Sequence, residues 1–310
     1  MKNRSYTRLL NETITIYEES GSLKAYQFMK EHAKNVEGNQ AQLFNFQYAL
    51  AAASDLKEEA LAIMREAIME QGYWYAYEYL QADEDLDSLR EFDEFQELVQ
   101  LCKQREEKAM EQAKPALTVL NNEDEQERPV LMAIHGDQEN AEMTAVAWNR
   151  AATKKYKLAF PQSTQIQFSD AYEWEDVALG VQEIEDHVNT LSSRDNLIIG
   201  GFSAGCHVAL RAILEQRISV DGFIFVAPWI PNIDEWRDAI DSLKNSNIKA
   251  YIICGEEDDD CLEGSKALSE LLEAQEVAHE LKIIQGLDHE YPEEFNEWLH
   301  RALQFINKRD

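Results

Sequence analysis

Apolar positions in the first third of the chain recur at helical spacing. Leu56, Leu61, Met64 and Ile68, for example, would share one face of a helix. Glycine is sparse in this part, and no proline precedes Pro115. The pattern predicts an all-helical region, with helices at 6–19, 23–34, 40–53, 56–71 and 92–112.

The period changes at Val130, where short apolar runs begin to alternate with helix-like stretches. Strands are predicted at 130–134, 158–160, 197–199, 222–226, 248–254 and 280–284, with a candidate edge strand at 116–120. Helices are predicted at 174–191, 204–214, 236–244, 264–274 and 291–306. Strands that alternate with helices form a parallel sheet covered on both faces. The predicted fold class is therefore a doubly wound, mostly parallel α/β sheet preceded by an all-α domain.

A polar, charged stretch separates the two parts. Residues 121–129 read Asn-Asn-Glu-Asp-Glu-Gln-Glu-Arg-Pro, which is typical of a linker. We therefore expect an all-helical domain at 1–118 and an α/β domain at 119–310. A chain of 310 residues with 45% hydrophobic residues is long enough to form both cores.

Charge and cysteine content indicate which kinds of partner the protein binds and in which cellular compartment it is located. The net charge of −30 argues against nucleic acid and anionic membranes as partners, because both favour clustered Lys and Arg. No apolar run reaches the roughly 18 residues of a membrane span, and the N-terminus has no apolar signal-peptide core. The four cysteines form no CxxC pair, as is typical of reduced thiols. We expect a cytoplasmic protein.

The stretch 196–210 places a buried-type strand, a tight turn and a helix around Ser203. The turn reads Gly201-Phe202-Ser203-Ala204-Gly205, a Gly-x-Ser-x-Gly pattern that alone is common in surface turns. Between a strand and a helix it predicts a nucleophile elbow, whose strained turn presents the serine hydroxyl above the sheet. Glycines are needed there because a larger side chain would collide with the neighbouring backbone.

A serine hydroxyl needs a base in hydrogen-bond reach, and the base needs a carboxylate that orients it. Both residue types follow later strands, in the chain order serine, acid, histidine. Asp258 follows the predicted strand that ends at Cys254, and His289 follows the strand that ends at Ile284. The sequence therefore predicts a Ser203–Asp258–His289 triad at the carboxyl ends of three strands.

Other residues of the same chemical types compete for these roles. Glu257, Asp259 and Asp260 are alternatives to Asp258 as the acid. Structural or surface interpretations are favoured for the other six histidines, His32, His135, His187, His207, His279 and His300. The acidic run 256–260 lacks the ligand spacing and the glycine of a calcium loop, so no metal site is predicted.

Residues 130–306 resemble an α/β-hydrolase of the phospholipase/carboxylesterase type, similar to the dienelactone hydrolases. The resemblance rests on four segments, His135-Gly136, Gly201-Phe202-Ser203-Ala204-Gly205, Gly255-x-x-Asp258 and Gly286-x-x-His289. It implies Ser203 as nucleophile, Asp258 as the orienting acid and His289 as general base, with no cofactor.

The same resemblance implies an oxyanion hole formed by the backbone N–H groups of Ala204 and Asp137. The acidic side chain of Asp137 departs from the family pattern, because a carboxylate near an oxyanion repels it unless it points away. Trp229, Ile230 and Trp236 are candidate substrate-pocket residues, and capping of the sheet is the alternative interpretation.

The helical domain resembles tetratricopeptide repeats, which have a period of about 34 residues. Small residues recur at a similar offset, as Ala25 and Ala60 do at 35 residues, and segments 45–51 and 55–61 carry most of the resemblance. The aromatic run 73–79 is either a binding surface or, as we favour, packing between helices.

Two hypotheses of function follow. The first is a serine hydrolase that cleaves a small-molecule carboxylic ester or thioester through an acyl-enzyme. The second is a catalytically silent hydrolase fold that binds a protein partner through the helical domain. Whether that domain acts as a lid or as a docking platform is left open by the motifs.

Overall fold

The computed structural model describes residues 5–120, 128–149, 155–191, 196–244 and 247–308. The chain forms two compact units. The first comprises Met1–Ala113 together with Ile166–Ala171, and the second comprises Lys114–Gln165 and Tyr172–Asp310. The predicted linker lies mostly at residues 121–127, outside the described residues.

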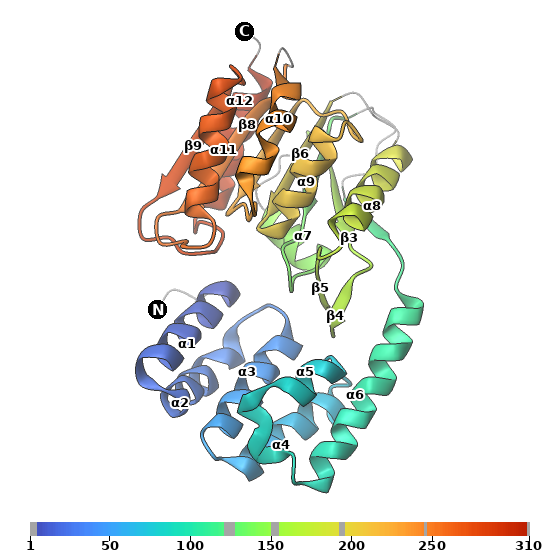
Figure 1. The fold of residues 1–310 in the computed structure, drawn as a ribbon, viewed down its shortest axis with the longest axis vertical. Helices are drawn as coiled ribbons and strands as arrows, with labels where there is room; N and C mark the ends of the chain where they lie inside the picture. Colours follow the sequence, from blue (N-terminus) through green and yellow to red (C-terminus); the bar gives the residue numbers. More distant parts are fainter. Residues whose placement is uncertain (1–4, 121–127, 150–154, 192–195, 245–246, 309–310) are drawn as a thin grey trace. The chain divides into compact units, whose positions relative to one another are not determined.

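Residues 5–113 of the first unit form helices without strands, as their periodicity predicts (Figure 1). Its α-helices are α1 (Tyr6–Ser20), α2 (Ser22–His32), α3 (Gln40–Ala53), α4 (Lys57–Arg65), α5 (Tyr77–Ala82) and α6 (Asp93–Gln112). Short 3₁₀ segments cover Ala33–Asn35 and Glu84–Leu89. The helix predicted at 56–71 is α4 followed directly by a π-helical turn at Glu66–Glu70. The short helix α5 was not predicted.

The core of the helical unit is built from the predicted apolar faces. Leu9, Met29 and Met64 are fully buried. Within the aromatic run 73–79, Tyr75 is 1% exposed, and its ring centroid lies 5.3 Å from that of Tyr48 on α3. For Tyr75, this arrangement agrees with the packing interpretation of the run.

The segment Ile166–Ala171 belongs to the helical unit although it lies far along the sequence. The amide N–H of Ser169 donates to the carbonyl of Trp74 over 3.1 Å, and the Trp74 N–H donates to the Ser169 hydroxyl over 2.8 Å. The ring of Phe168 stacks on Tyr75 at 6.2 Å between centroids. Backbone groups that would be orphaned after α4 are thereby satisfied by a distant strand.

The second unit is built on a seven-stranded sheet of order β1-β3-β2-β6-β7-β8-β9. The strands are β1 (Ala116–Leu120), β2 (Val130–Ile134), β3 (Lys157–Gln162), β6 (Leu197–Phe202), β7 (Gly222–Val226), β8 (Lys249–Gly255) and β9 (His279–Ile284). All neighbours pair in parallel except β1, which pairs antiparallel with β3 at the edge. The mostly parallel sheet is as predicted. Two short unpredicted strands, β4 (Ile166–Phe168) and β5 (Ala171–Tyr172), pair separately.

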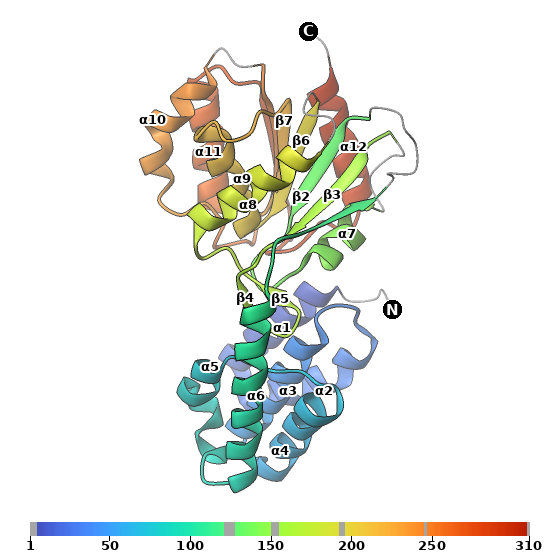
Figure 2. The same cartoon turned by 90° about the vertical axis from the view of Figure 1, so that its right-hand side faces the viewer.

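Helices cover both faces of this sheet (Figure 2). Helices α8 (Val177–Thr190), α9 (Ala204–Leu214), α10 (Arg237–Ile240) and α11 (Leu262–Ala274) lie on one face, and α7 (Ala141–Asn149) and α12 (Phe295–Asn307) on the other. All residues of β2, β6 and β7 are buried, which requires cover on both sides. Helix α7 was not predicted. The helical stretch predicted at 236–244 consists of the one-turn helix α10 between two 3₁₀ turns.

In the part of the chain that the structure describes, no helix is both long and apolar enough to cross a membrane.

We predict that Ser169→Ala lowers the free energy of unfolding by about 1–3 kcal/mol, because the Trp74 N–H would be left without its acceptor. Chemical denaturation of the purified chain measures this change. The exposed Ser242 provides a matched Ser→Ala control, for which we expect a change below about 0.5 kcal/mol. Equal effects of the two substitutions would contradict the assigned role of the Ser169 hydroxyl.

Candidate active site

Ser203 sits on a strained turn between β6 and α9. Its φ of 50° lies in the left-handed region, which a non-glycine residue seldom adopts. A Cβ placed on Gly201 would lie 2.9 Å from the Cys206 nitrogen, and one on Gly205 would lie 2.4 Å from the His135 carbonyl oxygen. The two glycines therefore let the turn and the start of α9 pack against neighbouring backbone, as the elbow pattern predicts.

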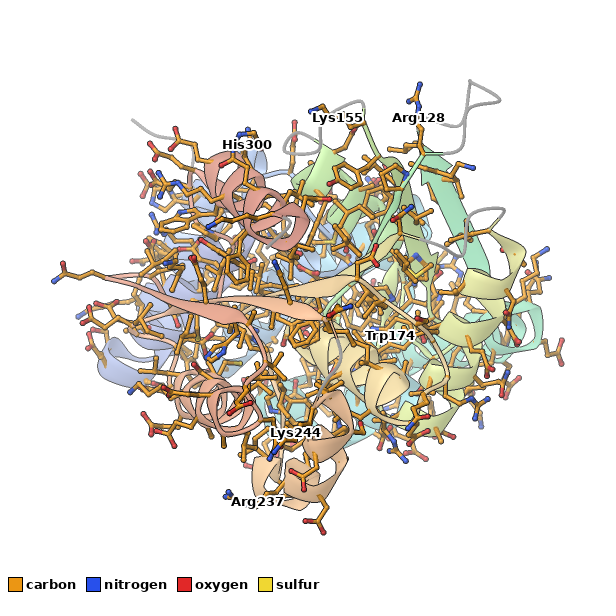
Figure 3. All side chains as sticks on the ribbon, turned by 90° about the horizontal axis from the view of Figure 1, so that it is seen from above. Arg128, Lys155, Trp174, Arg237, Lys244 and His300 are labelled. Carbon is orange, nitrogen blue, oxygen red and sulfur yellow. The ribbon has the colours of Figure 1, made fainter. Side chains whose placement is uncertain are left out.

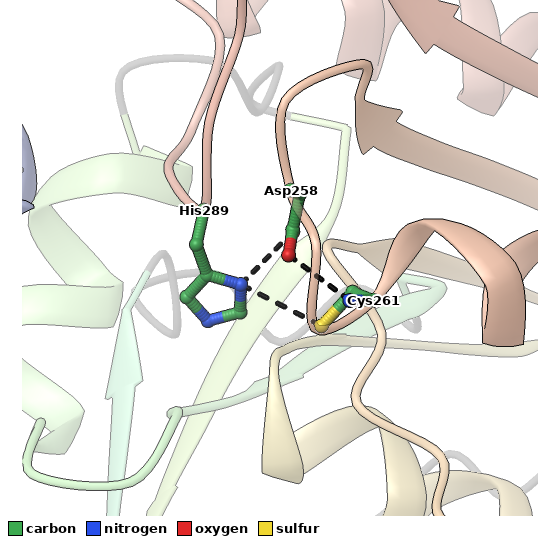
Figure 4. Close-up of side chains that lie close together, drawn as sticks. All are labelled: Asp258, Cys261 and His289. Carbon is green, nitrogen blue, oxygen red and sulfur yellow. Dashed lines mark hydrogen bonds and ion pairs between the residues drawn. The ribbon is translucent and has the colours of Figure 1, made fainter.

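The structure brings Ser203, His289 and Asp258 into one hydrogen-bonded chain. Nε2 of His289 lies 3.0 Å from the Ser203 hydroxyl, and Nδ1 lies 2.9 Å from Oδ2 of Asp258. Asp258 follows β8 and is 1% exposed, and its other oxygen accepts the Cys261 N–H (Figure 4). This geometry allows an imidazole to take a proton from the hydroxyl while a buried carboxylate holds the ring.

Electrostatics around His289 favour its charged form. Burial by itself lowers the pKa of His289, and the hydrogen bond and charge of Asp258 act in the opposite direction. The carboxylates of Glu139 and Asp260 add to this effect, and the pKa is raised above the ordinary value. A raised pKa makes the imidazole a stronger proton acceptor in its neutral form.

The acids that compete with Asp258 for the role of the triad acid differ from it in burial. Glu257, Asp259 and Asp260 are exposed, whereas Asp258 is buried against the imidazole. Of these four acids, Asp258 is the one whose carboxylate contacts the His289 ring in the structure.

Two of the other histidines lie outside the hydrogen-bonded series of Ser203, His289 and Asp258. His279 lies at the start of β9, where its ring nitrogens contact the Ser269 hydroxyl and the Val277 carbonyl. His300 is exposed on α12, at the outside of the view in Figure 3. Neither contacts Ser203 in the structure.

The turn after β2 packs directly against the elbow. A Cβ on Gly136 would lie 3.3 Å from that of Ser203. His135 is fully buried, and burial lowers its pKa to about 4, so the ring is neutral. Its Nδ1–H donates to the Gly136 carbonyl over 2.7 Å, and its own carbonyl accepts the indole N–H of Trp174. These bonds hold the turn in one conformation.

The structure places the backbones of both predicted oxyanion donors beside Ser203. Ala204 begins α9, and Asp137 follows the Gly136 turn. Neither backbone N–H donates to another residue within the described parts of the chain. One oxygen of the Asp137 carboxylate accepts the Trp174 backbone N–H over 2.9 Å.

Glu139 is a buried carboxyl group that sequence patterns did not single out. It is 9% exposed, and its Oε2 accepts the Gly136 N–H over 3.1 Å. Burial raises the pKa of Glu139 to about 7. Glu139 follows Gly136 by three residues, directly after a buried strand. At this spacing an acidic side chain can accept the backbone N–H of the turn, and this pattern could have identified Glu139 from the sequence.

The candidate pocket residues gather around His207 on α9. The ring centroids of Trp229 and Trp236 lie 5.9 and 5.1 Å from that of His207, while Ile230 is buried in the core of this face. The Trp229 N–H donates to the Ser203 carbonyl over 3.2 Å, and the Trp229 side chain is 41% exposed. Trp229 therefore borders the elbow. The burial of Ile230 agrees with the alternative interpretation, in which the residue packs on the sheet rather than lining a substrate pocket.

Asp258, Cys261 and His289 also form a group that could hold a metal, with ligand atoms within 4.8 Å of one another. It is the one such group found among the described residues. Burial, followed by the charge of Asp258, raises the pKa of the Cys261 thiol far above its usual range. In the structure Oδ2 of Asp258 bonds Nδ1 of His289, and Oδ1 accepts the Cys261 N–H, so the three residues form a hydrogen-bonded group.

The mostly parallel sheet and the serine on a strained turn after β6 define an α/β-hydrolase. Comparison with known families agrees. Residues 176–309 match the phospholipase/carboxylesterase family, which is a family of ester hydrolases, and residues 5–110 match a family described as the N-terminal domain of A/B hydrolase-like proteins. The second match does not test the resemblance to tetratricopeptide repeats, which stays a prediction.

Comparison with solved structures gives a match over nearly the whole chain. An uncharacterized protein from Bacillus cereus ATCC 10987 is 45% identical over 98% of this chain and 100% of its own, with a TM-score of 0.57. The chain belongs to the same family as that protein. A carboxylesterase from Mesorhizobium loti is 16% identical over 60% of this chain and 93% of its own (TM-score 0.51), and esterase PE8 is 16% identical over 62% and 99% (TM-score 0.53). The latter two share the fold. The comparison with curated proteins finds no match.

We expect ester hydrolysis to fall as the pH drops through the pKa of His289, which lies above the ordinary histidine value. Asp258→Asn removes the main group that raises this pKa, so the acidic limb moves to lower pH and kcat drops by about 10³–10⁴-fold. The profile of kcat/KM against pH on a p-nitrophenyl ester measures both. Asp260→Asn is the control, with a small shift and an unchanged plateau. An acidic limb that Asp258→Asn leaves in place would contradict the assignment.

Glu139→Ala should lower kcat by about tenfold, because the Gly136 N–H loses its acceptor and the oxyanion turn loosens. Glu139→Gln keeps an acceptor and should retain kcat within about threefold, while the loss of charge moves the acidic limb to lower pH. Steady-state kinetics over pH separate these effects. Equal loss of kcat in both variants, with no shift of the limb, would contradict a positioning role for this carboxyl.

Proposed function

We propose that the protein is a serine hydrolase that cleaves a small carboxylic ester or thioester. The observation that supports it best is the continuous hydrogen-bonded chain from the Ser203 hydroxyl through His289 to the buried Asp258. A fold without catalytic activity has no physical need for a serine strained at φ 50° within hydrogen-bond reach of an imidazole nitrogen.

In the proposed acylation step, the Ser203 hydroxyl oxygen attacks the carbonyl carbon of the substrate as its proton passes to Nε2 of His289. The carbonyl oxygen becomes an oxyanion, which the backbone N–H groups of Ala204 and Asp137 stabilise. Each such donor is typically worth about 10²–10³-fold in rate. Asp258 accepts from Nδ1 and stabilises the imidazolium. Collapse of the intermediate expels the alcohol or thiol, which takes the proton from His289.

In the proposed deacylation step, His289 accepts a proton from water, and the hydroxide attacks the acyl carbon. A second oxyanion forms at the same N–H groups, and its collapse returns the proton to Ser203 and releases the acid. Every bond change uses residues of the chain and water, so no cofactor is required by this scheme.

The match of residues 176–309 to the phospholipase/carboxylesterase family supports ester cleavage. Thioesters undergo the same acyl transfer with a better leaving group. The net charge of −30 disfavours strongly anionic substrates at long range. A cytoplasmic location, and a protein partner on the helical unit, remain part of this proposal.

Labelling with a fluorophosphonate tests the proposal directly, because only an activated serine reacts with it. We expect one adduct by intact mass on the wild type and none on Ser203→Ala. Ser163→Ala, at a serine outside the elbow, is expected to label fully. A folded wild type that takes up no adduct would contradict the proposal and favour the catalytically silent interaction protein.

A further inference from the structure

The helical unit contains a cavity that the proposed hydrolysis does not use. It measures about 230 Å³, more than the roughly 150 Å³ that holds a benzene molecule. Its lining comes from α1, α3, α5 and the turn after α5, and comprises Thr13, Ile14, Tyr17, Asn45, Phe46, Ala49, Leu50, Tyr79, Asp83 and Asp85. The cavity lies wholly inside one compact unit.

Apolar groups form most of the lining. Leu50 and Ala49 are buried, and the hydroxyl of Thr13 is occupied by the Leu9 carbonyl at 2.7 Å. Ile14 and Tyr17 are 45% and 39% exposed, which is high for large apolar side chains that line one cavity. An apolar body of a few carbons fits these walls.

Two carboxylates complete the lining without a cationic partner. Among the residues that the structure describes, no Lys, Arg or His forms an ion pair with Asp83 or Asp85. Arg90, on the same turn, donates instead to the carbonyls of Gln81 and Asp83 and pairs with Asp87. Burial and the charge of Asp83 raise the pKa of Asp85, so the pair repels within the folded chain.

Aromatic rings stand beside these carboxylates. The Tyr17 hydroxyl donates to Asp85 over 3.2 Å, and the Tyr79 hydroxyl accepts from the Asn45 amide over 2.8 Å. Faces of tyrosine rings attract organic cations, with about 0.5–2 kcal/mol per contact. A calcium ion is disfavoured, because it needs six to eight oxygen ligands and these walls are largely apolar.

We propose that this cavity binds an alkylammonium group, with its alkyl stem against Ile14 and Leu50 and its positive charge beside Asp83 and Asp85. The ligand class is a protonated amine on a short apolar stem. A free amine and a lysine side chain share this chemistry. The site is independent of Ser203 and of the proposed hydrolysis.

Isothermal titration calorimetry of the full chain tests the proposal with n-hexylammonium chloride as the probe. We expect one site per chain, with 1-hexanol at least about tenfold weaker because it lacks the charge. Hexanoate and calcium chloride should show no binding at this site. Acetyl-lysine-methylamide distinguishes the two sources: binding of comparable strength identifies a lysine side chain, and binding of hexylammonium alone identifies a free amine.

Asp85→Asn locates the site, since asparagine keeps an acceptor for Tyr17 and removes the charge. We expect it to weaken hexylammonium binding by about tenfold or more. Glu84→Gln is the matched control, because Glu84 is exposed on the same turn and does not line the cavity; its effect should stay within about twofold.

The thermal midpoint of unliganded Asp85→Asn should be no lower than that of the wild type, because repulsion with Asp83 is relieved. Such a midpoint also excludes misfolding as the cause of weaker binding. Three results would each overturn the proposal: no binding of hexylammonium, equal affinity for hexanol and hexylammonium, or equal affinity of the wild type and Asp85→Asn.

Discussion

The left-handed backbone of Ser203 is the constraint on which the catalytic unit depends. A non-glycine residue at φ 50° costs about 1–3 kcal/mol and persists only where its surroundings hold it. Here the Ser203 N–H donates to the Val226 carbonyl, and the Ser203 carbonyl accepts the Trp229 N–H. Both bonds connect the turn after β6 to the end of the neighbouring strand β7 and the loop that follows it. On another side, the Gly205 backbone packs against the His135 carbonyl.

Burial decides the charge of the groups around that turn. His135 is kept neutral because its ring is fully buried, and the pKa of Glu139 is raised to about 7 for the same reason. His289 differs, because the lowering of its pKa by burial is exceeded by the combined effect of Asp258, Glu139 and Asp260. Two histidines within one site therefore have opposite tendencies, one structural and neutral, the other prepared to accept a proton.

The helical unit is stabilised by its own core and by a strand borrowed from the α/β part of the sequence. Ser169 and Phe168 satisfy backbone and ring contacts next to Trp74 and Tyr75. Against this well-packed background, Asp83 and Asp85 beside an apolar cavity are an exception, since neither forms an ion pair within the described residues. Local conflicts of this kind are expected where a protein binds a ligand rather than where it only folds.

The sequence by itself determined the alternation of strands and helices, the elbow around Ser203 and the order serine, acid, histidine, because these depend on local period and on glycine geometry. It left Asp258 among four neighbouring acids. Only the tertiary structure distinguishes their surroundings, because it buries Asp258 against Nδ1 of His289 and exposes Asp259 and Asp260. The role of Glu139, the attachment of 166–171 to the helical unit and the cavity beside Asp85 arise from contacts between residues distant in sequence, and no local pattern encodes such contacts.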